Sequence, residues 1–155
     1  MNFNEEWGHQ IINIPVTTLD NIIYECNINN SLNISFIKID VEGGEFDVLL
    51  GSEKILLNHK PVVIFEDGML SNADLYGYNK EEYFQYFERL GYILFDFFGN
   101  EYTINDWGGE RKNFFIWLIH KDSEYLNYFR NNYAFFMQLF INLELKTNNK
   151  FNNKQ

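Results

Sequence analysis

Four short segments of the chain are almost continuously apolar, and the segments between them space their apolar positions as a helix does. The apolar segments span residues 33–41, 60–67, 91–98 and 114–120. Continuous apolar runs of this length are typical of strands that are covered on both faces, as in a parallel sheet. The pattern therefore predicts an α/β fold, with a mostly parallel sheet and flanking helices.

The segment that follows the first predicted strand has a helical pattern. It spans residues 43–59, and Phe46, Leu49, Leu50 and Leu57 form its apolar face. Its first turn is acidic, which suits the positive end of the helix dipole. The sequence predicts a helix that leaves the strand through a glycine-rich turn.

A second helix is predicted over residues 80–90 by its end signals as much as by its apolar positions. Asn79 and Glu82 have the spacing of a capping box, in which each side chain binds the backbone N–H of the other residue. Gly91 is placed to end this helix.

The two ends of the chain are less regular. Residues 11–20 predict a short strand, and Asp20 is placed as the N-cap of a brief helix over residues 21–26. Residues 122–146 predict a C-terminal helix with an aromatic face. That face could line a ligand site, or it could pack in the core or between subunits. Residues 147–155 are polar and low in complexity, and predict a disordered tail.

Charge and composition narrow the classes of partner. The 155 residues carry a net charge of −10 from 22 acidic and 12 basic side chains, which disfavours nucleic acid and anionic membranes. The single cysteine, Cys26, excludes an internal disulfide. No apolar run reaches the ~20 residues that span a bilayer, and the first residues lack a signal-peptide pattern. We expect a soluble, cytoplasmic protein of one domain.

Acidic residues follow two of the predicted strands at their carboxyl ends, where ligands bind in open α/β sheets. Asp40 and Glu42 follow the first strand, and Glu66 and Asp67 end the second. Asp40 could orient or deprotonate a hydroxyl, or these oxygens could hold a hard cation. Alternatively, Asp40 binds backbone N–H groups at the next helix start and Glu42 is solvated. Glu66 and Asp67 could instead be solvated loop acids, and this alternative is favoured more strongly for Asp67 than for Glu66.

Three consecutive segments carry a resemblance to a known family. They read "IKIDVEGGEFDVLLG", "KPVVIFE" and "GYILFDFFG", with "VTTLD" before them and "NFFIWLIHK" after them. In this order they resemble the FkbM-like family of S-adenosylmethionine-dependent methyltransferases. The resemblance covers residues 16–121. It implies a Rossmann-like, doubly wound sheet of seven strands, of the class I methyltransferase type.

The resemblance also implies an activity and candidate site residues. Members transfer a methyl group from S-adenosylmethionine, usually to an oxygen of a sugar-like or secondary-metabolite acceptor. Asp40 occupies the position of the family's active-site acid, and Glu42, Glu45 and Glu66 match further acids of the pattern. We expect Asp40, Glu42 and Glu66 to be the catalytic residues, and we assign no metal ligand.

One family feature has no counterpart in the sequence. A first strand with a Gly-rich cofactor turn should precede "VTTLD" by several dozen residues, so the cofactor-binding residues stay unassigned. We expect residues 1–121 to form a truncated methyltransferase domain that corresponds to its C-terminal two-thirds. The missing strand would leave residues 33–41 as a sheet edge. We expect a strand formed by residues 11–17 to cover this edge. Alternatively, a second copy of the chain covers it, or the chain is a fragment of marginal stability.

Three functions stay open from the sequence. The first is a methyltransferase, active or made inactive by truncation, that acts on a small-molecule or sugar-like hydroxyl. The second is a non-catalytic remnant that binds or oligomerises through the sheet edge or the C-terminal aromatic helix. The third is an acid-lined metal site without cofactor.

Overall fold

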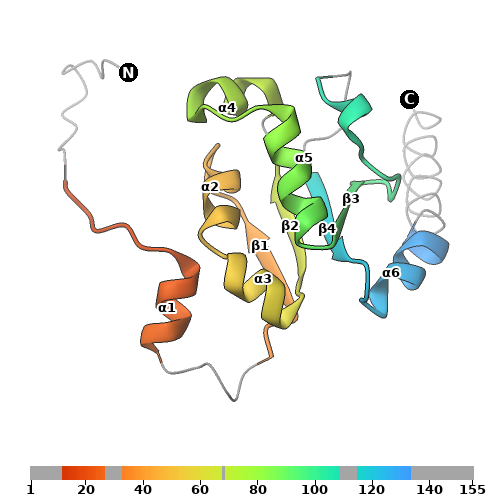
Figure 1. Ribbon diagram of the computed structural model, residues 1–155, viewed down its shortest axis with the longest axis horizontal. Coiled ribbons are helices and arrows are strands. Elements are labelled where there is room, and N and C mark those ends of the chain that lie inside the picture. Colours follow the sequence, from red (N-terminus) through yellow and green to blue (C-terminus); the bar gives the residue numbers. More distant parts are fainter. Residues whose placement is uncertain (1–11, 27–32, 68, 109–114, 134–155) are drawn as a thin grey trace, which may run out of the picture.

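A four-stranded mixed sheet forms the centre of the molecule in the computed structural model, which describes residues 12–26, 33–67, 69–108 and 115–133 (Figure 1). The strands are β1 (Phe36–Ile39), β2 (Val62–Glu66), β3 (Tyr92–Asp96) and β4 (Phe115–His120), in the spatial order β1-β2-β4-β3. The four strands predicted from the continuous apolar segments are all present, so the α/β class is confirmed.

The expectation of a mostly parallel sheet is wrong. Among the strands that the structure describes, only β1 and β2 pair in parallel, whereas β4 is antiparallel to both β2 and β3. The connections between the strands explain this difference. Two parallel neighbours need a long crossover connection, which usually contains a helix. Helices α2 and α3 supply that crossover between β1 and β2, but the described part of the connection from β3 to β4 holds only a short 3-10 turn, η2 (Ile104–Asp106).

The predicted helix over residues 43–59 is two helices. They are α2 (Glu45–Leu50) and α3 (Glu53–His59), and the chain bends between them at Gly51 and Ser52. The buried face also differs from the one predicted. Phe46 and Leu49 are buried as expected, whereas Leu50 and Leu57 are exposed and Ile55 and Leu56 are buried in α3.

The N-terminal prediction is wrong in two respects. Residues 12–18 form no strand, and within the described residues β1 pairs only with β2, so the expected cover of its edge is not there. Helix α1 (Leu19–Glu25) has Thr18 as its N-cap. Asp20 caps a different helix: its carboxylate accepts the backbone N–H groups of Lys54 and Ile55 at 2.9 and 3.1 Å. This bond pair fastens α1 to the start of α3.

The capping-box prediction is confirmed at helix α5 (Lys80–Arg89). The Asn79 side chain accepts the Glu82 N–H at 2.9 Å, and Glu82 accepts the Asn79 N–H at 3.0 Å. Gly91 follows the helix with a φ of +76°, and a Cβ there would lie 3.0 Å from Nε2 of His120. A side chain at this position would meet both backbone strain and a steric conflict.

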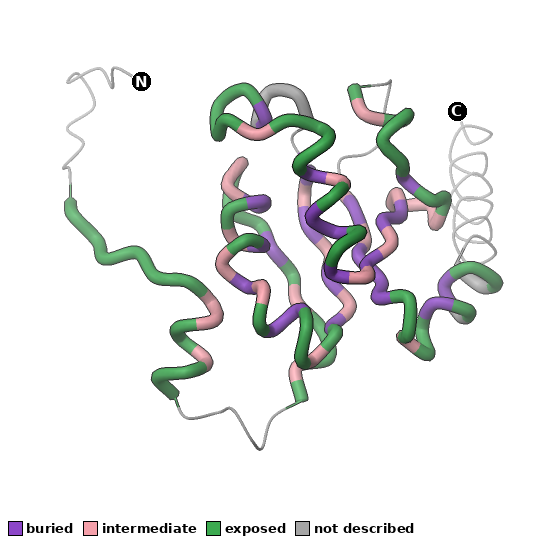
Figure 2. The backbone as a smooth tube through the Cα atoms, in the orientation of Figure 1, coloured by how far each residue is buried: buried purple, intermediate pink, exposed green. Residues whose placement is uncertain are grey.

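Side chains pack on both faces of the sheet. Helices α2, α3 and α5 cover one face, and the buried segments concentrate between them and the strands (Figure 2). Fully buried members of this layer include Leu49, Val63, Phe87 and Leu118. On the other face, Leu126 of α6 (Tyr125–Tyr128) and Phe129 of η3 (Phe129–Tyr133) pack with residues of β3 and β4. The remainder of the predicted C-terminal helix and the predicted tail lie outside the described residues.

Two further features complete the fold. Helix α4 (Met69–Tyr76) precedes α5 at the carboxyl end of β2. In the part of the chain that the structure describes, no helix is long and apolar enough to cross a lipid bilayer.

Candidate functional site

Asp40 stands at the end of β1 and is half exposed. Its carboxylate pairs with the ammonium of Lys38 at 2.5 Å. Ile39 is in register with Phe65 of β2. The residues that follow them, Asp40 and Glu66, are therefore neighbours at the carboxyl end of the two strands. The structure therefore brings these two predicted residues together.

Glu42, the third predicted residue, lies in the turn between β1 and α2. Its side chain is exposed, and its φ of +55° is in the left-handed region, which few residues other than glycine adopt. Gly43 follows with a φ of +118°. Two consecutive residues with positive φ turn the chain sharply from the strand into the helix.

Glu45 holds this turn. Its Oε1 accepts the backbone N–H groups of Val41 and Gly43 at 3.2 and 3.1 Å, and only 3% of the residue is exposed. Its Oε2 is buried without a hydrogen-bond partner among the described residues. Asp40 is bonded to Lys38, and it is Glu45 that binds the N–H groups of the turn. The sequence indicated Glu45 only as one acid of a motif, because a Glu in the first turn of a helix is common for the helix dipole alone.

The second strand ends in acids of unequal exposure. Glu66 is half-buried, whereas Asp67 is only 3% exposed and lies 3.4 Å from the hydroxyl of Tyr83. The alternative in which Asp67 is the more solvated acid is wrong. A buried carboxylate beside a phenol is stabilised by that contact, since burial without a partner is costly.

Aromatic side chains lie behind these acids. Tyr78 packs against Phe46 and Tyr83 with ring centroids 4.7 and 6.0 Å apart, and Trp107 packs against Tyr83 at 4.9 Å. Burial, and then the negative charge of Asp67, raises the pKa of the Tyr78 hydroxyl well above its usual range, and Glu45 and Asp47 add to the effect. Tyr78 is therefore a neutral hydrogen-bonding group at neutral pH. Nothing in the sequence distinguished it from a core tyrosine.

We call this set the acidic rim: Asp40, Glu42, Glu45, Glu66 and Asp67. It combines exposed carboxylates at the sheet edge with buried ones beneath them. Within the rim, Asp40 forms an ion pair with Lys38. The rim can accept hydrogen bonds from hydroxyl or ammonium groups and repels anions.

The sequence model of the methyltransferase FkbM domain matches residues 2–94. The chain belongs to the FkbM methyltransferase family. No curated protein and no solved structure matches it. The match includes all five residues of the acidic rim and most of β3, and it ends before β4.

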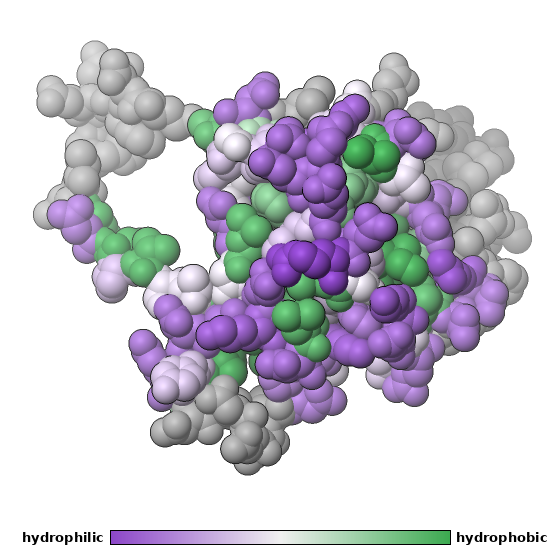
Figure 3. Space-filling view, in the orientation of Figure 1, coloured by the Kyte–Doolittle hydropathy of each residue, from purple (hydrophilic) through white to green (hydrophobic). Residues whose placement is uncertain are grey.

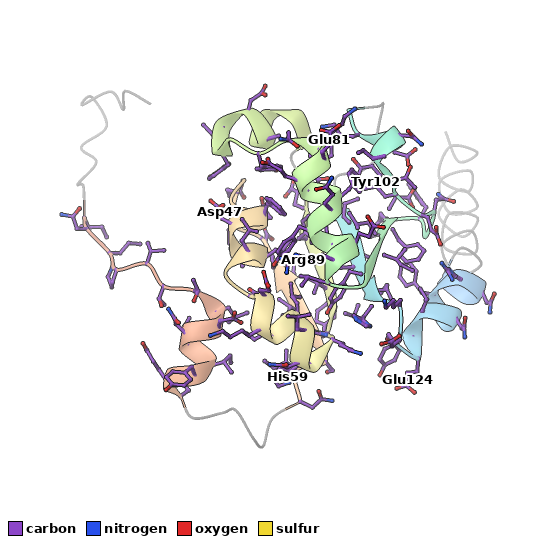
Figure 4. All side chains as sticks on the ribbon, in the orientation of Figure 1. Asp47, His59, Glu81, Arg89, Tyr102 and Glu124 are labelled. Atoms are coloured by element: carbon purple, nitrogen blue, oxygen red, sulfur yellow. The ribbon has the colours of Figure 1, made fainter. Side chains whose placement is uncertain are left out.

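Two other features of this FkbM domain bear on its chemistry. Among the described residues, no group of three His, Cys, Asp or Glu side chains is placed to hold a metal ion. A hollow of about 580 Å³ lies along α5, β3 and η2, where Glu81 and Tyr102 are among its lining residues (Figure 4). The acidic rim does not contribute to this hollow.

Proposed function

We propose that this FkbM domain serves S-adenosylmethionine-dependent methyl transfer to a hydroxyl oxygen of a small, sugar-like acceptor. The observation that carries the proposal is the acidic rim, which lies within the family match and at the carboxyl edge of β1 and β2. Carboxylates in this position suit a neutral, hydroxyl-bearing acceptor and disfavour a phosphorylated one.

The described residues complement part of S-adenosylmethionine in charge. Its sulfonium and ammonium groups are cationic, and the exposed carboxylates of Asp40 and Glu42 complement that charge. No Gly-rich turn follows a strand upstream of β1 within the described residues, so no residue here is assigned to the adenosine. When bound, S-adenosylmethionine would supply the methyl group. We assign the described acidic residues to the acceptor side of the site.

The chemistry that these residues provide is proton handling. In the proposal, the Asp40 carboxylate accepts a hydrogen bond from the acceptor hydroxyl, orients its oxygen and takes up its proton as the oxygen is methylated. Such general-base assistance contributes about 10²- to 10⁴-fold to a rate. Lys38 restrains the carboxylate through its ion pair, while Glu42 and Glu66 flank it and accept hydrogen bonds from neighbouring acceptor hydroxyls.

Calorimetric titration tests the proposal directly. S-adenosylmethionine and S-adenosylhomocysteine are titrated into the 155-residue chain, with Asp40→Ala as the matched variant. Binding at tens of micromolar or tighter, about −6 kcal/mol or better, supports the proposal. Absence of heat and of any thermal shift, from protein shown to be folded, would count against it and would identify an inactive domain.

A second candidate function is favoured by the edge of β1. Within the described residues this strand has one neighbour, and its Phe36 is 53% exposed. An uncovered apolar edge is a template for pairing with another strand. A second copy of the chain, added at β1, would make the domain an oligomerisation module. A dimer that depends on β1 and is unaffected by the cofactor would support this function over the first.

A further inference from the structure

The turn that joins β1 to α2 has an unfavourable backbone. Glu42 and Gly43 both have positive φ, at +55° and +118°, and Glu42 carries a side chain that makes this conformation uncommon. Backbone of this kind persists only where surrounding contacts hold it, and it is concentrated at functional sites. The turn must therefore have a specific support.

The side chain of Glu45, in the first turn of α2, provides that support. One carboxylate oxygen accepts two backbone N–H groups of the turn, from Val41 and Gly43. These two residues bracket Glu42, so the bonds fix both ends of its left-handed conformation. No other side-chain hydrogen bond to the backbone of this turn is present among the described residues.

Holding the turn does not by itself require a carboxylate. A glutamine would offer the same acceptor oxygen without a buried charge, and buried polar atoms are rarely left unbonded. Yet Oε2 of Glu45 has no partner in the described part of the chain, and Glu45 is close enough to Tyr78 to affect its ionisation, as is the buried Asp67. Departures from complete hydrogen bonding are expected where function, and not stability alone, has shaped the site.

We infer that Glu45 is the positioning residue of the acidic rim: through the Val41 and Gly43 N–H groups it fixes the turn that presents Asp40 and Glu42 to the acceptor. The inference rests on the proposed function, because it assigns Glu45 a role at the same site. Glu45 itself stays buried and touches no acceptor.

Amide hydrogen exchange tests whether Glu45 fixes the turn, and it does not require the protein to be active. The amides of Val41 and Gly43 are followed by NMR in the wild-type chain, Glu45→Ala and Glu45→Gln, with the amides of Val63 and Phe65 in β2 as the control for the fold. In Glu45→Ala we expect exchange at the two turn amides to become about 10- to 100-fold faster, with β2 unchanged. Glu45→Gln keeps the acceptor oxygen, so it should return both amides to near the wild-type rates.

Two outcomes would overturn the inference. Unchanged exchange at Val41 and Gly43 in a folded Glu45→Ala protein would show that other contacts hold the turn. An equal rise at the turn and in β2 would show a general loss of stability. If Glu45→Ala does not fold, Glu45→Asp replaces it, since its side chain is one methylene shorter and should not reach both N–H groups.

Enzyme kinetics test whether Glu45 acts by positioning Asp40. With a methyl acceptor turned over by the wild-type chain, Glu45→Ala should lower kcat. The double variant with Asp40→Ala should be no slower than Asp40→Ala alone, because both changes disable one unit. Additive losses would contradict the positioning role. A wild-type chain without turnover counts against the proposed function only, and the exchange measurement then decides the role of Glu45.

Discussion

Two buried side chains that can carry charge, Glu45 and His120, each bind backbone N–H groups at the end of a strand. Glu45 accepts from the turn after β1, and Nδ1 of His120 accepts the N–H of Asp122 after β4, at 3.1 Å. Such bonds let a polar side chain lie in the interior without losing all of its hydrogen bonding.

His120 makes the stability of the fold depend on pH. Burial, and then the positive charge of Lys60, lowers the pKa of His120 below its usual value of 6.5. As the pH falls through about 6.5, the unfolded chain takes up a proton that the folded chain resists, so stability is lost. We expect urea unfolding to show a loss of at most about 1.4 kcal/mol per pH unit from this group between pH 7 and 5.5.

The variant His120→Asn provides the comparison, because its side-chain oxygen can accept the same N–H without titrating. Its stability should change less over the same pH range, while carboxylates act on both proteins at lower pH. Identical slopes for the two proteins would show that His120 does not titrate on unfolding in this range.

Sequence patterns placed the acidic residues at the ends of β1 and β2, but they did not show which of these residues holds the turn. Asp40 and Glu66 could be placed at one edge because strand ends in α/β folds follow from apolar runs. Which acid binds the turn depended on the positive φ values of Glu42 and Gly43 and on the burial of Glu45, which no spacing along the chain reveals. The burial of Asp67 likewise depends on Tyr83, 16 residues further along the chain.

At the scale of elements, α1 is fastened to the body of the domain through Asp20, by its side chain and by its backbone N–H, which donates to the Gly51 carbonyl at 3.1 Å. The Asp20 carboxylate accepts two N–H groups in the first turn of α3, which has no side-chain cap of its own. An N-cap acid of this kind contributes about 0.5–2 kcal/mol. Asp20 therefore serves α3 as a cap and α1 as an anchor.

We expect Asp20→Ala to lower the free energy of unfolding by about 1–2 kcal/mol. Asn21→Ala, an exposed neighbour in the same helix, is the matched control and should change it by less than about 0.5 kcal/mol. Urea titrations of the three proteins make the comparison. Equal losses in both variants would mean that helix α1 itself, and not the cap, supplies the stability.

Contacts close in sequence were predictable at this scale, and distant ones were not. The capping box of Asn79 and Glu82 joins residues three apart and was predicted. The Asp20 cap joins residues 34 and 35 apart, and an N-cap assigned from local sequence goes to the nearest helix. The break between α2 and α3 was missed for a related reason: the apolar positions on both sides of Gly51 are compatible with one continuous helix.

At the scale of the whole molecule, the helix-covered face is mainly hydrophilic, with separate small hydrophobic patches (Figure 3). The edge of β1 is a more specific surface for association. Val62 donates its N–H to the Ser35 carbonyl at 3.0 Å, and alternate residues of a parallel strand bond to the same neighbour. The Lys38 N–H therefore faces away from β2, toward any strand added at the edge.

If a second copy pairs at β1, Lys38→Pro should abolish the dimer without unfolding the domain. Proline removes the outward N–H and leaves the bonds between β1 and β2 intact. Lys38→Ala is the control, because it removes the same ion pair with Asp40 and keeps the N–H. Sedimentation velocity should show dimers for the wild type and Lys38→Ala and monomers for Lys38→Pro. A monomeric wild type would exclude this association.

The order of the strands also governs how the chain can assemble. Strand β4 lies between β2 and β3, although it is the last of the four to be synthesised. Until residue 120 has left the ribosome, β3 has no strand beside it, and β2 has only β1. Before β4 forms, the β1–β2 pair and strand β3 are therefore not joined, and the edges that will face β4 are unpaired. The insertion of β4 between β2 and β3 completes the sheet. A stop codon before β4 would leave both inner edges open to other chains, so the sheet cannot close before β4 has been synthesised.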